Sequence, residues 1–436
     1  MTYPQAQDYL NSFVNYEWLD SYPYKSSFKL ERVQRLLHLL GNPHRTLRAI
    51  HIAGTKGKGS TCAFVANILR EAGFKTGLYT SPHLVDVRER IRILQFAEEI
   101  SKKDFARLIE KIRPHAEKLR KTRSGKLSYY EILTSLAFLY FKKEECDFVV
   151  LETGIGGKLD ATNVASSLAC AITPISYEHT HLLGATLKKI AAEKAGIIKN
   201  RTPIVITAPQ RPAVLKVIRR RAKEVGADLY EVGKDIQIRE KSRSLFGQSF
   251  DVKGIFAEYS GLKIGLLGGH QIVNAAVAIG CAESLRSQGV VKVSREAIRE
   301  GLKKTRWPGR LEVISRNPGV VLDAAHNRAS ACALKNALNK FFKFRNLILV
   351  FGVCRDKDVK GILKELIPCA SRIILTRAQN PRALAPETIK SFIKTNARPV
   401  ALTQNPAQAM KIARGSAGQK DLILVTGSIY VVGEVI

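Results

Sequence analysis

A glycine-rich segment near the N-terminus combines residue types that bind phosphate. Residues 54–61 read Gly-Thr-Lys-Gly-Lys-Gly-Ser-Thr, between an apolar run at 48–53 and a helical pattern that begins at about Ser60. Glycines let backbone N–H groups approach phosphate oxygens, and the positive end of a helix dipole attracts anions. Lys58 can reach the β- and γ-phosphates of a nucleotide, and a hydroxyl of Ser60 or Thr61 can help to hold Mg²⁺. The segment therefore predicts a nucleotide-phosphate site.

The segment departs from the strict phosphate-loop pattern in two places. That pattern requires Gly where Ile52 stands and a hydroxyl where Gly59 stands. A glycine-rich turn without a ligand is the alternative interpretation. The order of strand, loop, lysine and helix favours the phosphate site, because that order supplies amide groups, a cation and a helix dipole together.

Apolar and helical segments alternate around this loop, which predicts a parallel sheet with helices on both faces. Buried strands are predicted at 48–53, 75–80, 147–152 and 169–173, and helices at 29–40 and from about 60 to 72. Sheets of this kind place their sites at the carboxyl ends of their strands. Glu152, which ends one predicted strand, is therefore a candidate functional residue.

The pattern changes near residue 305. A helical stretch at 295–304 is followed by Trp307-Pro308-Gly309-Arg310, and a second alternating series then begins. Its predicted strands are 319–322, 347–351, 372–375 and 422–425. The sequence therefore predicts two domains, 1–305 and 306–436, of which the second is a smaller α/β domain.

A series of motifs resembles the folylpolyglutamate synthase/dihydrofolate synthase family of the Mur ligase superfamily, beginning with the Gly-Thr-x-Gly-Lys form of the loop. The matching segments occur in order along nearly the whole chain, at 80–84, 89–91, 151–163, 178–180, 193–197, 269–276, 307–312, 323–327 and 426–428. The resemblance implies an α/β protein with a phosphate-loop-containing, Mur-ligase-like ATPase domain that carries the folate site. A smaller, Rossmann-like C-terminal domain of the glutamate-ligase type would follow it.

The resemblance also implies a reaction. An amide forms from a carboxylate only after activation, so ATP would transfer its γ-phosphoryl group to a folate or dihydropteroate carboxylate. The amine of L-glutamate would then attack the acyl phosphate. The protein would contribute positioning and electrostatic stabilisation, with ATP and two Mg²⁺ ions as cofactors.

Site residues follow from the resemblance motif by motif. Lys58 and His326 would be catalytic, and the ATP contacts would be Thr55, Lys56, Gly57, Lys58, Gly59, Ser60, Thr61, Asn274, Arg310 and Asp323. The metal region would comprise Ser81, Glu152, His179 and Lys194, with Lys194 carbamylated by CO₂. Taken alone, His179 reads as a loop histidine and Lys194 as a surface lysine. Two positions depart from the family pattern, namely Glu178 in place of Asp and Arg328 in place of Pro.

Substrate contacts are predicted at six residues: Arg90, Tyr129, Tyr130, Leu159, Asp160 and Ala161. Arg90 would bind a substrate carboxylate. An aromatic ring at 129–130 would stack on a pterin, and a core aromatic on the following helix is the equal alternative. The stretch 28–30 is a further candidate.

Composition limits the class of protein. The chain has 436 residues, of which 45% are hydrophobic and 25% charged, which is typical of a globular protein. We expect no membrane span, because no apolar run reaches eighteen residues, and no secretory signal at the N-terminus. The seven cysteines are scattered and predict buried free thiols in a reducing compartment. We therefore expect a cytoplasmic protein. We also expect it to act as a monomer.

Positive charge is the unusual feature of the composition. The chain has 70 Lys and Arg residues against 38 Asp and Glu, a net charge of +32. The densest short clusters are 88–92, 118–126 and 216–223, but the charge is spread along the chain. A basic surface attracts ATP and other anionic small molecules. A basic nucleic-acid-binding NTPase is an alternative, although it leaves the motifs of the second domain unexplained, and we expect no nucleic-acid partner.

A second alternative is another Mur-type amide ligase, of the kind that builds peptidoglycan precursors. Those enzymes carry a whole UDP-sugar domain before the phosphate loop, whereas 53 residues precede Gly54 here. That length is short for a domain. The sequence leaves open whether dihydropteroate, tetrahydrofolate or both are the acceptor.

Overall fold

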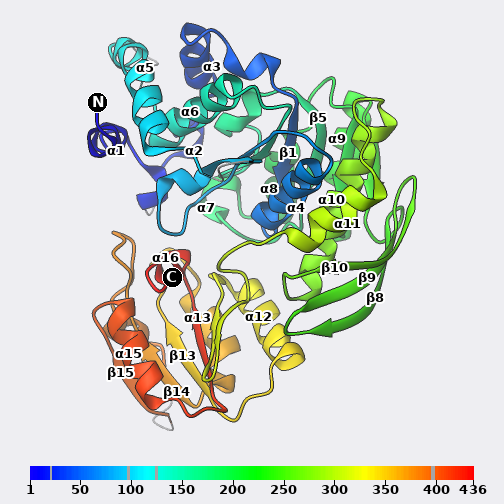
Figure 1. The fold of residues 1–436 in the computed structure, drawn as a ribbon. Coiled ribbons are helices and arrows are strands. Elements are labelled where there is room, and N and C mark those ends of the chain that lie inside the picture. The colour runs from blue at the N-terminus through cyan, green and yellow to red at the C-terminus, as the bar shows by residue number, and fades with distance from the viewer. Residues whose placement is uncertain (20–21, 96–98, 123–125, 394–397) are drawn as a thin grey trace. The chain divides into compact units, whose positions relative to one another are not determined.

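The computed structural model describes residues 1–19, 22–95, 99–122, 126–393 and 398–436. The chain divides into two compact units, and Figure 1 shows the elements of both. The first comprises 1–242, 249–264 and 270–305, and the second comprises 243–248, 265–269 and 306–436. Two short segments that precede residue 305 therefore belong to the second unit.

The first unit is built on a seven-stranded sheet with the strand order β3-β2-β4-β1-β5-β6-β7. Its strands are β1 (Ala49–Ala53), β2 (Thr76–Tyr79), β3 (Ile91–Leu94), β4 (Phe148–Glu152), β5 (Ser167–Ile172), β6 (Ile204–Thr207) and β7 (Asp228–Glu231). β3 runs antiparallel to β2, and the other neighbours are parallel. Every residue of β1 and β4 is buried, as expected of central strands with helices on both faces. The four predicted strands are confirmed.

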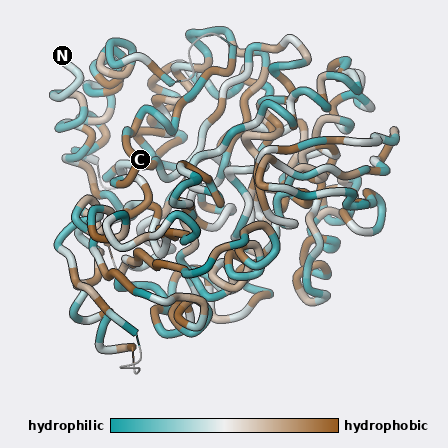
Figure 2. The backbone as a smooth tube through the Cα atoms, turned by 60° about the horizontal axis from the view of Figure 1, so that its bottom comes forward, coloured by the Kyte–Doolittle hydropathy of each residue, from teal (hydrophilic) through white to brown (hydrophobic). Residues whose placement is uncertain are grey.

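Eleven helices surround this sheet among the described residues. They are α1 (Tyr3–Asn11), α2 (Tyr24–Ser27), α3 (Leu30–Leu39), α4 (Lys58–Glu71), α5 (Lys102–Arg120), α6 (Tyr129–Lys143), α7 (Thr180–Leu183), α8 (Leu187–Ala195), α9 (Pro212–Val225), α10 (Gly269–Ser287) and α11 (Arg295–Lys304). One apolar core joins α1, α3, α5 and α6, and a second joins α8 and α9 to β5 and β6. Many helices change between hydrophilic and hydrophobic within a turn, as Figure 2 shows.

A small three-stranded sheet follows β7 in the chain. It consists of β8 (Gln237–Ser244), β9 (Gly247–Lys253) and β10 (Glu258–Ile264), in the order β10-β9-β8. Nearly all of β8 is exposed, whereas β9 alternates between partly and fully buried residues. The sequence reasoning did not predict this sheet.

The second unit has a six-stranded sheet with the order β11-β12-β16-β13-β14-β15. Its strands are β11 (Glu312–Arg316), β12 (Gly319–Leu322), β13 (Leu347–Phe351), β14 (Arg372–Leu375), β15 (Val400–Leu402) and β16 (Leu422–Thr426). Its helices are α12 (Arg328–Phe341), α13 (Val359–Leu366), α14 (Pro386–Ser391), α15 (Pro406–Ser416) and α16 (Ile429–Gly433). β11 is antiparallel and the other pairs are parallel, so the predicted α/β organisation and its four strands are confirmed.

The helix after the glycine-rich segment begins at Lys58, two residues earlier than predicted, directly after Gly57, which adopts a left-handed conformation. All seven cysteines are free, but Cys332 and Cys369 are partly exposed, so the expectation of buried thiols holds for five of them. No helix in the described parts of the chain is long and apolar enough to cross a membrane.

Helix α11 packs unusually closely on α4. A Cβ atom added at Gly301 would lie 2.5 Å from the Cα atom of Ile68 and 2.7 Å from its backbone nitrogen. The backbone of α4 cannot move aside easily, because ten of its residues are buried. A glycine is therefore required at this crossing even though glycine is a poor helix former.

Replacing Gly301 with Ala is expected to destabilise the first unit by about 1–3 kcal/mol through overpacking, despite the gain in helix propensity. Urea unfolding followed by circular dichroism measures the change. Gly415→Ala in α15 is the control, because a Cβ there meets nothing within 4 Å. It should be neutral or stabilising by about 0.5–1 kcal/mol. Equal stability of Gly301→Ala and the parent chain would disprove the tight crossing.

Candidate active site

Two glycines give the loop after β1 its shape. Gly54 has φ +151°, and a Cβ atom there would lie 1.8 Å from the hydroxyl oxygen of Thr173, which follows β5. Gly57 has φ +87°, and a Cβ atom there would lie 2.3 Å from the side-chain oxygen of Asn274 on α10. Larger side chains are excluded at both positions. The predicted ATP contact Asn274 is therefore placed against the loop, where it is 2% exposed.

The segment after β5 braces the first half of the loop. The backbone N–H groups of Thr55 and Lys56 both donate to the carbonyl of Pro174, at 3.0 and 3.2 Å. The Thr55 hydroxyl accepts from the N–H of Ser176 at 3.1 Å and donates to its carbonyl at 3.2 Å. The Lys56 ammonium lies 2.8 Å from a carboxylate oxygen of Glu178. The amide groups of Thr55 and Lys56 thus have protein partners already.

The start of α4 differs from the first half of the loop. Gly57 precedes the helix and supplies no side chain to cap the amide groups of its first turn. The hydroxyl of Thr61 is buried without a hydrogen-bond partner among the described residues, and Ser60 is 3% exposed. An uncapped helix N-terminus with buried hydroxyls nearby is a suitable binding place for phosphate. These are the amides and hydroxyls that the sequence assigned to a nucleotide.

A carboxylate and an ammonium group meet at the ends of β1 and β4. Ile52 pairs with Glu152 in the register of these strands, so the last residue of β4 lies beside the loop. One oxygen of Glu152 accepts from the backbone N–H of Ser81 at 3.2 Å. The other lies 3.8 Å from the ammonium nitrogen of Lys58. Two predicted metal residues and the predicted catalytic lysine are therefore close together.

Lys194, near the end of α8, is buried rather than on the surface. It is 5% exposed, and its ammonium group donates to the carbonyl of Gly54 at 2.6 Å. Burial, together with the positive charges of Lys58 and Lys56, lowers the pKa of Lys194 to about 7. Lys194 therefore loses its proton more easily than an exposed lysine, and the interpretation as an ordinary surface lysine is wrong.

His179 immediately precedes α7 with φ 49°, and its ring centroid lies 6.5 Å from that of His181. It follows Glu178, whose ion pair with Lys56 ties this turn to the loop. Among the described residues, no three His, Cys, Asp or Glu side chains form a metal-binding group. A metal ion here would take oxygen atoms from other donors as well, which suits Mg²⁺ because it keeps several waters and phosphate oxygens.

The predicted aromatic contacts have different environments. Tyr129 belongs to the apolar core of the first unit. Tyr130 is partly buried, its ring centroid lies 5.9 Å from that of Tyr79, and its hydroxyl donates to the Glu152 carbonyl at 3.5 Å. A Cβ atom added at Gly154 would lie 2.9 Å from the Tyr130 ring. Tyr130 therefore lies next to the metal region, whereas Tyr129 fits the alternative of a core aromatic.

The Asp160 carboxylate organises the glycine-rich turn after β4. Asp160 is 1% exposed and accepts from the N–H groups of Gly154 and Ile155, at 2.9 and 3.2 Å. Its other oxygen accepts from the N–H and hydroxyl of Thr162, at 3.0 and 2.5 Å. Its neighbours Leu159 and Ala161 are partly and fully buried. Both oxygens of Asp160 are thus engaged within the protein.

In the second unit, one aspartate joins two of the motifs. The Asp323 carboxylate accepts from the N–H groups of Leu311 and Ala325, each at 2.9 Å. The Arg310 guanidinium donates to the Gly309 carbonyl at 3.0 Å. The segments 307–312 and 323–327 are thereby held together, which places Arg310 and Asp323 in one local structure.

His326 and Arg328 lie at the start of α12. The ring Nδ1–H of His326 donates to the Ala324 carbonyl at 2.8 Å, because a carbonyl oxygen can only accept. The proton is thus on Nδ1 when the ring is neutral. Arg328, which stands where the family often has Pro, is the first residue of α12 and bonds to Glu365 on α13 at 3.3 Å. The departure therefore leaves the helix start intact.

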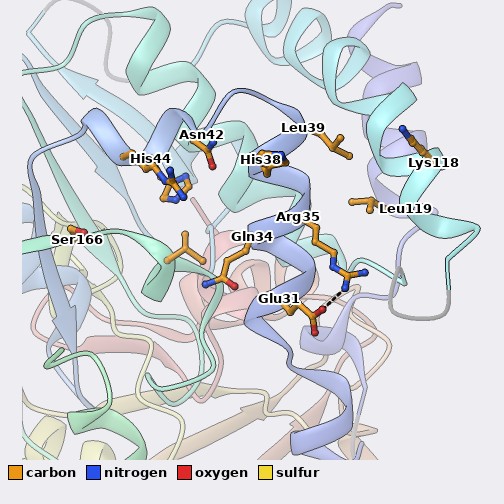
Figure 3. A pocket seen from close by; sticks show the side chains of 12 residues that line it. Glu31, Gln34, Arg35, His38, Leu39, Asn42, His44, Lys118, Leu119 and Ser166 are labelled. Atoms are coloured by element: carbon orange, nitrogen blue, oxygen red, sulfur yellow. Dashed lines mark hydrogen bonds and ion pairs between the residues drawn. The ribbon is translucent and has the colours of Figure 1, made fainter. Parts of the chain in front are cut away.

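A groove of about 780 Å³ lies elsewhere in the first unit, and Figure 3 shows side chains of α3 and of the turn at 43–46 around it. Its lining includes Gln34, Arg35, His38, Asn42, Arg45 and Lys118. Arg35 is ion-paired with Glu31 on the same helix. The groove adjoins the chain that leads into β1, whereas the phosphate loop leaves the other end of that strand. None of the predicted site residues lines it.

Sequence reasoning missed several residues that shape the site. Thr173, Pro174 and Ser176 brace the loop from 120 residues away, and their own sequence shows no motif that points to this. Glu17 was also missed. It forms a bidentate ion pair with Arg90, at 2.7 and 2.6 Å, although it belongs to none of the matched motifs. Only the fold brings such residues together.

Comparison with known proteins agrees with this arrangement. Residues 52–282 match the family model of the Mur ligase middle domain, and residues 309–429 match that of the Mur ligase glutamate ligase domain. The fold, the phosphate loop and these two matches define a Mur-type ligase.

Individual relatives identify the family within the Mur-type ligases. The chain is 36% identical over 407 residues to the dihydrofolate synthase/folylpolyglutamate synthase of Bacillus subtilis. The alignment covers 93% of this chain and 94% of that protein. It is similar to the Mycobacterium tuberculosis folylpolyglutamate synthase solved with ADP and AMPPCP, with a TM-score of 0.87, 33% identity and coverage of 94% and 95%. A solved FPGS–AMPPCP–folate complex gives a TM-score of 0.84, 28% identity and coverage of 100% and 98%. The chain belongs to the folylpolyglutamate synthase/dihydrofolate synthase family.

Buried histidines in the first unit give stability a predictable dependence on pH. His51 in β1 has no exposed surface, and burial lowers its pKa to about 3. Burial and the charge of Arg45 lower the pKa of His44 to about 4. The unfolded chain, with histidine pKa values of about 6.5, binds protons that the folded chain excludes. Stability is therefore complete above about pH 6.5 and falls as pH falls, by about 1.4 kcal/mol per pH unit and histidine.

Urea unfolding between pH 5 and 6.5 should show this loss, in a range where most carboxylates remain ionised. His44→Gln should make the dependence shallower by about one proton. His38→Gln, on the exposed side of α3, is the control and should leave the slope unchanged. An unfolding free energy that stays constant over this range would contradict the assignment.

Proposed function

We propose that this chain joins L-glutamate to a folate-type carboxylate through an acyl-phosphate intermediate, using ATP. The observation that carries the proposal is the uncapped start of α4, with Lys58 beside the carboxylate of Glu152 at the carboxyl ends of two neighbouring strands. Family membership and the nucleotide and folate complexes of similar proteins support the same reaction.

The reaction proceeds in two transfers. A carboxylate oxygen of the acceptor takes the γ-phosphoryl group of ATP, the bond to the β-phosphate bridging oxygen breaks, and ADP leaves. The amine of glutamate then attacks the carbonyl carbon of the acyl phosphate, loses a proton, and expels phosphate to leave an amide. The amides at the start of α4 and the Lys58 ammonium stabilise negative charge on the moving phosphoryl group.

The remaining contacts are proposed for three residues of the second unit and two of the first. Asp323 is proposed for the ATP ribose, Arg310 for a phosphate, and His326 for the region of the incoming glutamate and γ-phosphate. The Nδ1–H bond of His326 to the Ala324 carbonyl fixes the ring orientation, so its other nitrogen is presented in a defined direction. Asn274 is proposed for the adenine or ribose, and Tyr130 for the acceptor.

Glu152, Ser81, His179 and a carbamate on Lys194 are proposed to hold two Mg²⁺ ions. Bound Mg²⁺ would neutralise charge on the phosphate oxygens. The Lys194 amine adds to CO₂ and releases a proton, which turns a cation into an anionic oxygen donor. The burial of Lys194 and its contact with the loop at Gly54 support this modification, because an uncharged amine is required.

We further propose that the enzyme is a cytoplasmic monomer that acts on small molecules and does not use nucleic acid.

Glutamate incorporation by the purified protein tests the proposed ligase function directly. Dihydropteroate and tetrahydrofolate are offered separately with ATP, MgCl₂ and radiolabelled L-glutamate. Labelled product that depends on both ATP and an acceptor is the expected result, and its absence with both acceptors would refute the proposal.

Lys58→Ala is expected to lower kcat by about 10²–10³-fold, the size of losing one preorganised partner of the transferring charge. The same glutamate-incorporation assay measures it. Lys111→Ala, an exposed lysine on α5, is the charge-matched control and should keep parental activity. Near-normal ligation by Lys58→Ala would remove this lysine from the mechanism.

Lys194→Ala is expected to lose most activity, and acetate should restore part of it by supplying the missing carboxylate oxygen. Lys194→Arg should stay inactive, because a guanidinium remains charged and cannot form the carbamate. Lys188→Ala, exposed on the same helix, is the control and should be silent. Full activity of Lys194→Arg would exclude the carbamate and leave the role of the phosphate loop standing.

A further inference from the structure

Arg90 is among the largest side chains that the first unit buries completely. It is 1% exposed, and its two terminal nitrogens donate to the two carboxylate oxygens of Glu17, at 2.7 and 2.6 Å. Its Nε–H donates to Nδ1 of His83 at 2.9 Å, and its guanidinium lies 5.7 Å from the ring centroid of Tyr129. The planar guanidinium of Arg90 thus binds Glu17 and His83 at the same time.

Burying the ion pair of Arg90 and Glu17 in the core has a cost in desolvation free energy. Burial lowers the pKa of Arg90, but the Glu17 carboxylate more than offsets that effect, so the guanidinium stays charged. Removing two charges from water costs free energy, and apolar side chains of similar volume often stabilise a core equally well. Packing alone therefore gives no reason for Arg90 and Glu17. Their directional hydrogen bonds give a reason for burying this pair, because the bonds fix the positions of the groups that they join.

One of those groups is the segment 80–86, which contains Ser81. The backbone carbonyl of Arg90 accepts from the N–H of Thr80 at 3.0 Å. The neighbouring Glu89 carboxylate accepts from three consecutive N–H groups of this segment, at 2.8, 2.8 and 2.7 Å, those of Leu84, Val85 and Asp86. His83 lies between these two attachments, and the Arg90 side chain is what holds it.

The other group is the N-terminal segment that carries Glu17. The Asn15 side chain accepts from the N–H of Glu17 at 3.0 Å, which fixes the turn at its start. The Val14 carbonyl accepts from the N–H of Tyr129 at 3.0 Å. Glu17 is therefore anchored to the beginning of α6, the helix that also carries Tyr130, and it presents a carboxylate whose position is already determined.

Ser81 connects this arrangement to the candidate active site. Its backbone N–H donates to the Glu152 carboxylate, whose other oxygen lies beside Lys58. We propose that Glu17 and Arg90 are positioning residues, whose buried ion pair holds His83 and the segment 80–84 so that Ser81 orients the Glu152 carboxylate. The inference rests on the proposed function of Glu152, and it replaces a substrate carboxylate with that of Glu17 as the partner of Arg90.

Two substitutions test the pair. Glu17→Gln keeps the size of the side chain but removes its charge and one acceptor. Arg90→Lys keeps the positive charge but cannot donate to Glu17 and His83 in the same planar geometry. Arg88→Lys is the matched control, because Arg88 lies on the same turn and pairs with Asp86 and Glu99 at a partly exposed position.

Three quantities are measured for each full-length variant: the thermal unfolding midpoint, hydrogen exchange of the amides of 80–86, and kcat with KM for ATP. We expect faster exchange confined to 80–86 and a kcat lower by about 10²-fold, the cost of misplacing a catalytic group by about 1 Å. KM for ATP should change much less than kcat, since the phosphate loop itself is intact. Arg88→Lys should match the parent chain in midpoint, kcat and KM and in the exchange of 80–84, because its partner Asp86 lies at the end of the segment.

Unchanged exchange and kcat in both variants would overturn the proposal. So would a uniform rise in exchange across the first unit with a lowered midpoint, because that pattern marks a purely structural role. If Arg90→Lys does not fold, the milder Glu17→Gln decides between the outcomes. The parent chain is assayed alongside: its inactivity would refute the proposed function, whereas the exchange experiment tests the positioning independently of activity.

Discussion

The parallel pairing of β1 with β4 on one side and β5 on the other is the constraint on which the candidate site depends. Parallel strands end at one edge of a sheet, so the segments that follow them meet there. The loop after Ala53, the carboxylate of Glu152 and the segment after Ile172 are brought together in this way, although they are far apart in the sequence. The contacts of the loop with the segment after β5, from Gly54 against Thr173 to the amides held by Pro174, follow from this register.

The same edge concentrates charge on partly and fully buried side chains. Lys58, Lys56 and Lys194 gather around one loop, and the carboxylates of Glu152 and Glu178 provide counter-charges. Isolated buried charges are costly, whereas charges with partners at short range are tolerated. The arrangement holds cations where a phosphate group would supply further negative charge. It also explains why one of the three lysines, the most deeply buried, loses its usual affinity for a proton.

The predicted strands of the two sheets could be found from sequence because they are short and apolar on both faces. The helices predicted at 29–40 and 60–72 could be found from their helical spacing of apolar residues. Strand β8 shows no apolar alternation because most of it faces solvent, and β9 buries Gln248 among its inward residues, so this sheet was missed. The loop residues and Glu152 could be proposed from type and spacing. The sequence could not show whether Asp160, Tyr129 and Arg90 contact a substrate or are bound within the protein. A residue type does not reveal whether its carboxylate, ring or guanidinium is buried or exposed. The partners of Tyr129 and Arg90, Val14 and Glu17, are distant in the sequence and are set by tertiary contacts, whereas Asp160 is held within its own turn by Thr162.

The start of α4 has a consequence for the lifetime of the protein as well as for its chemistry. The Thr61 hydroxyl is buried without a partner in the described structure, and an unsatisfied buried polar group costs about 1–3 kcal/mol. A bound phosphate group would satisfy it and the uncapped amides together, and a ligand that binds only the folded state adds to its stability by mass action. Nucleotide bound at this helix start would therefore also make the folded chain more resistant to unfolding and to proteolysis.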